Sequence, residues 1–91
     1  MGVQHPDTMK LRKINNNCHE LVTKNAAILF SYETPVAVSF DLPMGDKYGV
    51  YKTADKHSTT TTRHINKWTA TTRTLPQNDI EFLAHVILRA A

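Results

Sequence analysis

The stretch AAILFSYETPVAVSFD, residues 26–41, decides the fold of this chain. Its first part, AAILFSY, is apolar at successive positions, which is typical of a strand buried on both faces near the centre of a sheet. The later part, VAVSFD, alternates, so Val36, Val38 and Phe40 are expected on one face of the next strand. Between them, ETP (residues 33–35) predicts the turn that joins the two strands.

Strand-like segments continue on both sides of this pair. On the N-terminal side, MKLRKIN (9–15) and CHELVTK (18–24) flank an asparagine turn at 15–17, and a short helix is the alternative for CHELVTK. On the C-terminal side, LPMGD (42–46) predicts a turn before KYGVYKT (47–53). Because connections this short cannot make parallel crossovers, these runs predict an antiparallel meander of four or five strands.

The pattern changes to a helical one at Ser58. Ile65 and Trp68 lie three apart, and Thr61 and Thr72 extend the same apolar stripe. The segment ATTRTLPQN (70–78) reads as a connector. The predicted fold class is therefore α+β: an antiparallel β-meander of four or five strands followed by one or two C-terminal helices.

The last segment, NDIEFLAHVILRA, predicts a helix that is covered on most of its surface. Asn78 precedes Glu81 by three residues, which suggests a capping box. Only Glu81, His85 and Arg89 form a polar stripe, so the rest must lie against the sheet or another subunit. We expect a homo-oligomer, a dimer or larger, through this C-terminal helix.

Length and composition favour one small cytoplasmic domain. The 91 residues divide into a flexible N-terminal segment, 1–8, and a single domain, 9–91, and translation could start at Met1 or Met9. Cys18 is the only cysteine, so no intramolecular disulfide can form, as suits a reducing cytoplasm. No apolar run has membrane-spanning length and no signal pattern is visible, so no membrane association is expected.

The positive charge is concentrated in one segment. The total is a formal +3, but residues 47–73 contain six cations and one acid, Asp55, giving a formal +5. A basic segment on a near-neutral remainder points to an anionic partner, whereas a solvated, solubilising surface is the plain alternative.

The threonine run in KHSTTTTRHINKW (56–68) is the main candidate site. Threonine is a mediocre helix former, but in a first turn its hydroxyl can satisfy free N–H groups, with Ser58 or Thr59 as the N-cap. The same geometry suits a phosphate, because a helix N-terminus offers N–H donors and a positive dipole end. The predicted anion- or nucleic-acid-binding residues are Lys56, Ser58, Thr59, Thr60, Arg63 and Lys67. Tyr48, Tyr51 or Trp68 could stack on a base if exposed, although Trp68 is expected in the core.

Catalysis, metal binding and cofactor binding are not expected. The residue types of a catalytic triad, Asp, His and Ser, occur in DKHS (55–58). Neighbours in a turn, however, cannot easily form the required line of nucleophile, base and orienting group. Cys18 and His19 are adjacent and would face opposite sides of a strand, and no other pair has metal-ligand spacing. The three glycines are isolated, so no phosphate loop is present. His64 next to Trp68 is expected to be a packed, hydrogen-bonded histidine.

Two motifs carry a resemblance. The segments SYETPVA (31–37) and YKTADKHSTTTTRHINKW (51–68) are similar to the SYxTPVA and SxTTxRHINK patterns of small bacteriophage proteins and domains of unknown function. The resemblance covers roughly residues 18–70 and implies a phage protein made in a bacterial host. It carries over no activity and no binding residues.

Two function classes fit these observations. The first is a non-enzymatic module that binds nucleic acid or a nucleotide through a basic 47–73 surface. The second is a protein-binding effector that inhibits a host or anti-phage defence protein through a sheet face, a strand edge or the last helix. A virion or structural subunit is a third option. The charge bias favours the first class.

Overall fold

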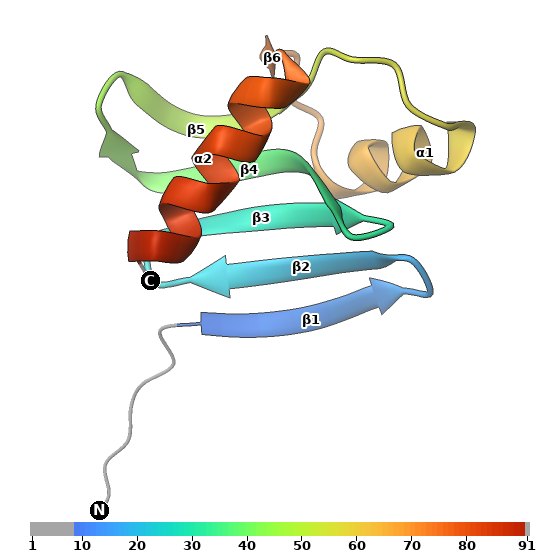
Figure 1. The fold of residues 1–91 in the computed structure, drawn as a ribbon, viewed down its shortest axis with the longest axis horizontal. Helices are drawn as coiled ribbons and strands as arrows, with labels where there is room; N and C mark the ends of the chain where they lie inside the picture. Colours follow the sequence, from blue (N-terminus) through green and yellow to red (C-terminus); the bar gives the residue numbers. More distant parts are fainter. Residues whose placement is uncertain (1–8, 91) are drawn as a thin grey trace, which may run out of the picture.

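Five consecutive strands pair with their neighbours in chain order and form an antiparallel meander (Figure 1). The computed structural model of the protein describes residues 9–90, so the segment expected to be flexible, 1–8, lies outside the described residues. The strands are β1 (Met9–Asn15), β2 (Cys18–Thr23), β3 (Ala26–Ser31), β4 (Thr34–Met44) and β5 (Lys47–Thr53). CHELVTK is thus a strand rather than a short helix.

Each of the four hairpins has a loop of two residues: 16–17, 24–25, 32–33 and 45–46. In the third loop, Tyr32 (φ 53°) and Glu33 (φ 70°) both adopt left-handed backbone, as a type I′ hairpin turn requires. Each such non-glycine residue costs about 1–2 kcal/mol. The turn expected at residues 33–35 therefore begins one residue earlier, and Pro35 lies in β4.

The two helices cover opposite faces of the sheet. Helix α2 (Gln77–Ala90) packs Ile80, Leu83, Ala84 and Ile87 on one face, and α1 (Thr59–Trp68) packs Ile65 and the partly buried Trp68 on the other. In β3, Ile28 contacts the α2 side and Leu29 the α1 side. Both are 0% exposed, which confirms β3 as a central strand. The predicted α+β class, with a meander followed by two helices, is confirmed.

A register shift in β4 corrects the expected face of Val36. The pairing of β3 with β4 slips between Leu29 and Phe30, as a β-bulge does. Val36 consequently packs with Leu29 on the α1 side, whereas Val38 and Phe40 pack beneath α2. The prediction that these three β4 residues share one face is wrong for Val36, because simple alternation does not cross a bulge.

The segment expected to be a connector contains a sixth strand. β6 (Thr74–Leu75) pairs in parallel with β5 and forms the second edge of the sheet. The long link through α1 makes this parallel pairing feasible. Thr72 falls beyond the end of α1 and does not extend its stripe.

The predicted capping box of the last helix is wrong, because α2 begins at Gln77 and Asn78 lies inside it. The Pro76 carbonyl accepts the first helical hydrogen bond, from the Ile80 N–H at 3.1 Å. The Gln77 N–H donates to Asp55 Oδ1 at 3.3 Å, and Gln77 Nε2 donates to the Pro35 carbonyl at 2.7 Å. Segments distant in the sequence, the loop at Asp55 and the start of β4, therefore anchor the first residue of this helix.

Candidate functional site

Ser58 is the N-cap of α1. Its Oγ accepts the Thr61 N–H at 3.2 Å, which confirms one of the two expected caps and uses the serine hydroxyl within the chain. Thr61 is 4% exposed, whereas its three threonine neighbours in the run are exposed. The run thus supplies one buried residue and an exposed first turn.

A chain of hydrogen bonds, buried at Thr61, Ser31 and His64, joins α1 to β3. The Ser58 hydroxyl donates to Thr61 Oγ1 at 3.2 Å, Thr61 Oγ1 lies 2.9 Å from Ser31 Oγ, and Ser31 Oγ lies 2.8 Å from His64 Nδ1. If each hydroxyl donates once along this chain, Nδ1 accepts and His64 carries its proton on Nε2. The prediction that His64 is a packed, hydrogen-bonded histidine is confirmed, since it is 7% exposed.

The exposed side of α1 and the β1–β2 turn enclose a shallow hollow. We call it the α1 hollow; its lining residues are Asn15, Asn16, Asn17, Thr60, Arg63, His64 and Lys67. Its volume is about 370 Å³, within the range of small-molecule sites. Figure 1 places the β1–β2 turn, the β3–β4 turn and α1 together at one end of the sheet. The Tyr32 N–H donates to the Asn17 carbonyl at 2.9 Å and ties the two turns together.

The α1 hollow is positively charged. Arg63 and Lys67 are exposed, and within residues 9–90 neither makes an ion pair. In the same part of the chain, no aspartate or glutamate lines the hollow. The asparagine amides add both donors and acceptors. This combination suits an anion that also offers hydrogen-bonding groups.

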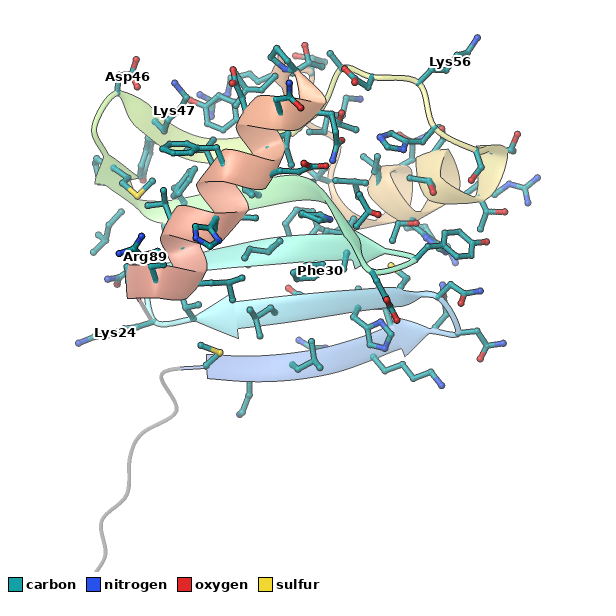
Figure 2. All side chains as sticks on the ribbon, in the orientation of Figure 1. Lys24, Phe30, Asp46, Lys47, Lys56 and Arg89 are labelled. Atoms are coloured by element: carbon teal, nitrogen blue, oxygen red, sulfur yellow. The ribbon has the colours of Figure 1, made fainter. Side chains whose placement is uncertain are left out.

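The structure gathers three of the six predicted site residues. Thr60, Arg63 and Lys67 follow one another on the same helix stripe and line the α1 hollow. Ser58 is the cap, and Thr59 is exposed in the first turn without lining the hollow. The Lys56 side chain points away from the sheet and from α1 (Figure 2).

The basic 47–73 segment does not form one continuous surface. Arg73 lies over the Tyr51 ring, 4.6 Å from its centroid, and donates Nη1 to the Tyr51 hydroxyl at 3.2 Å. Tyr51 belongs to the core beneath α2, so Arg73 is on the face opposite to α1. Lys47 donates to Asp46 at 3.1 Å, a hydrogen bond that lowers the pKa of the Asp46 carboxyl. The cations of this segment that line one common hollow are therefore Arg63 and Lys67.

Tyr32 is the exposed aromatic residue nearest the α1 hollow. It is 50% exposed, and its ring centroid lies 6.1 Å from that of His64. Of the aromatic residues named from the sequence, Tyr51 is buried and Trp68 is partly buried against the α1-side core. Tyr48 is exposed, but it lies at the start of β5 beside the β4–β5 turn, at the other end of the sheet from α1 (Figure 1). Sequence reasoning missed Tyr32 and the three asparagines as site residues. The one sequence feature that relates Tyr32 to α1 is the pairing of two motifs in the resemblance: SYETPVA contains Tyr32, and the 51–68 motif contains α1.

The residues of types common in catalytic and metal sites make hydrogen bonds or are buried elsewhere in the fold. His57 Nε2 lies 3.1 Å from Gln77 Oε1, and Asp55 accepts from the Gln77 backbone, so DKHS is not assembled as a triad. Ser31, the serine hydrogen-bonded to His64, is only 2% exposed to solvent. Across the described residues, no group of three His, Cys, Asp or Glu side chains could hold a metal ion. Burial raises the pKa of the Cys18 thiol, and the Glu20 carboxylate adds to the effect.

Neither helix in the part of the chain that the structure describes has the length and apolar character needed to cross a bilayer.

Comparison with protein families identifies the family of this chain. Residues 9–82 match the model of a family described as a family of unknown function, DUF8033. No curated protein and no solved structure matches the chain. The matched residues include all six strands, α1 and the start of α2, and they exceed half of the chain. The protein therefore belongs to the DUF8033 family.

Proposed function

We propose that the protein is a non-enzymatic module that binds nucleic acid at the α1 hollow. The observation that carries the proposal is the pair Arg63 and Lys67, exposed and without an ion-pair partner among the described residues, above an amide-rich turn. Arginine and lysine are the usual partners of phosphate groups in such interfaces.

The spacing of the two cations supports a phosphodiester or nucleotide ligand. Arg63 and Lys67 are four residues apart in α1, so they stand about 6 Å apart along the helix axis. Asparagine side chains in the facing turn can hydrogen-bond both phosphate oxygens and base edges. A free nucleotide shares this chemistry and is the smallest ligand of the proposed class.

The resemblance to phage proteins gives the proposal a setting. We place the protein in the cytoplasm of a phage-infected bacterium, where both phage and host nucleic acids are accessible. The exposed threonines Thr59 and Thr60, with Lys56 in the preceding loop, would then border the binding site rather than form its centre.

A protein-binding effector that inhibits a host or defence protein is the second candidate. The observation that favours it is β1, an edge strand of seven exposed residues in which Leu11 is 65% exposed. Edge strands offer unpaired backbone groups to a partner strand. Specific capture of one defined host protein, lost in Leu11→Asp but kept in Arg63→Glu/Lys67→Glu, would favour this candidate over the first.

The decisive experiment compares two charge reversals of equal size. Arg63→Glu/Lys67→Glu changes the α1 hollow, whereas Lys24→Glu/Arg89→Glu changes two exposed cations at the other end of the sheet (Figure 2). Binding of a labelled oligonucleotide is measured by fluorescence anisotropy at several salt concentrations, and folding by circular dichroism.

We expect the first variant to lose at least about tenfold in affinity at low salt, because two phosphate contacts are lost and their counterions stay bound. Both variants should keep the wild-type free energy of unfolding within about 0.5 kcal/mol, as exposed substitutions usually do. Equal losses in both variants would indicate a net-charge effect. Unchanged binding in the first variant would place the interface elsewhere.

A further inference from the structure

The β3–β4 turn carries side chains that its backbone disfavours. Type I′ turns favour Asn-Gly, because both central residues need positive φ. Here the two positions are Tyr32 and Glu33, the only non-glycine residues with positive φ among residues 9–90. An aromatic side chain at such a position weakens the hairpin, so local stability does not account for it.

The Tyr32 ring stands at the rim of the α1 hollow. Its centroid is 6.1 Å from that of His64, which lines the hollow, and its backbone N–H is bonded to Asn17, which also lines it. His64 is in turn held by the hydroxyl of Ser31, the residue before Tyr32. The strained turn and the wall of the hollow are therefore fixed to each other, while half of the Tyr32 surface stays exposed.

We propose that Tyr32 stacks on an unpaired base of single-stranded nucleic acid while Arg63 and Lys67 hold the adjoining phosphates. This inference rests on the proposed function and specifies its substrate class. Exposed aromatic rings beside cations bind bases that are free to leave their own stack, which duplex bases are not. A single stack of this kind changes affinity by about 5- to 150-fold.

The sharpest variant replaces the turn with its favoured sequence. Tyr32→Asn/Glu33→Gly relieves the backbone strain, so the melting temperature should rise by about 4–8 °C or more. Affinity for a single-stranded oligonucleotide should nevertheless fall at least about fivefold, because the stacking ring is gone. Removal of the Glu33 charge acts in the opposite direction, since it favours an anionic ligand. A loss of binding in a more stable protein therefore cannot come from unfolding or from charge.

Two further variants serve as controls. Tyr32→Phe keeps the ring and should bind within about twofold of wild type. Tyr48→Ala removes another tyrosine, 55% exposed on β5, and should leave both binding and folding unchanged.

The ligand series separates this inference from the proposed function. The probes are a thymidine oligonucleotide, an abasic strand of equal length and the annealed duplex. Wild type should prefer the thymidine strand over both others, and the Tyr32→Asn/Glu33→Gly variant should bind it and the abasic strand alike. If wild type binds all three equally, or the variant keeps wild-type affinity while Arg63→Glu/Lys67→Glu abolishes binding, Tyr32 has no stacking role and the proposed function stands. If wild type binds none of them, both proposals fail.

Discussion

Ser31 and His64 are 33 residues apart in the sequence, yet Ser31 Oγ lies 2.8 Å from His64 Nδ1 in the folded protein. Ser31 opens the SYETPVA motif and His64 lies in the STTTTRHINKW motif, so this bond connects the two segments that carry the phage resemblance. The contact holds α1 against the β3–β4 turn. The geometry of the α1 hollow depends on it, because His64 and the Tyr32 ring lie side by side there.

Ser31→Ala should lower the free energy of unfolding by about 1–3 kcal/mol, because Thr61 and His64 each lose a buried partner. Urea denaturation followed by the fluorescence of Trp68, the only tryptophan, measures the change. Ser39→Ala is the matched control, a half-buried serine on the next strand, and should cost less than about 0.5 kcal/mol. Similar values for the two variants would show that the hydroxyl chain does not stabilise the fold.

The stability of the protein should fall at alkaline pH because of Cys18. Its thiol pKa is raised above the ordinary value of 9.0 by burial and by Glu20, so the folded state favours the neutral thiol and the unfolded state ionises first. The contribution of the neutral Cys18 thiol to the free energy of unfolding is fully present below about pH 9. It is lost as the pH rises through the thiol pKa of the folded state. The free energy of unfolding, measured from pH 7 to 10, should therefore fall more steeply with pH for wild type than for Cys18→Ala. Parallel pH profiles would contradict this, since all other groups are common to both proteins.

Self-association, if it uses the last helix, should depend on Phe82. Four α2 residues are buried against the sheet, but Phe82 is 65% and Leu88 38% exposed, so the helix is covered less completely than its sequence suggests. We expect Phe82→Asp to shift a sedimentation profile from dimer to monomer, because a carboxylate at an apolar contact is costly to desolvate. Tens of micromolar is far above the Kd of a stable dimer. If wild-type protein sediments as a monomer at that concentration, α2 is not an interface between subunits.

The meander was predictable because most of its strands carry a local pattern and each of its loops is short; CHELVTK, for which a short helix was the alternative, is the exception. AAILFSY identified the central strand, and the position before a helical stripe limited the cap to Ser58 or Thr59, of which the structure has Ser58. These inferences needed only neighbouring residues. The location of α2 and its apolar face were also readable, since Ile80, Leu83, Ala84 and Ile87 recur at helical spacing.

What could not be predicted depends on contacts between distant segments. The bulge at Leu29/Phe30 moves Val36 to the other face, and Asp55 rather than Asn78 satisfies the start of α2. β6 has two residues and no pattern of its own; it is a strand because β5 offers it an edge. The α1 hollow also depends on distant segments, because nothing in the local sequence NNN (15–17) indicates that this turn lies opposite Arg63 and Lys67.

The placement of both helices after the sheet has a consequence for synthesis on the ribosome. All five meander strands leave the exit tunnel before α1 and α2, and each hairpin can close locally, so the sheet can form early. Until residues 59–90 follow, however, Ile28 and Leu29 are uncovered on opposite faces of a sheet with an open edge at β1. The nascent chain thus passes through a state prone to aggregation, and the rate at which the last third is translated should govern the yield of folded protein.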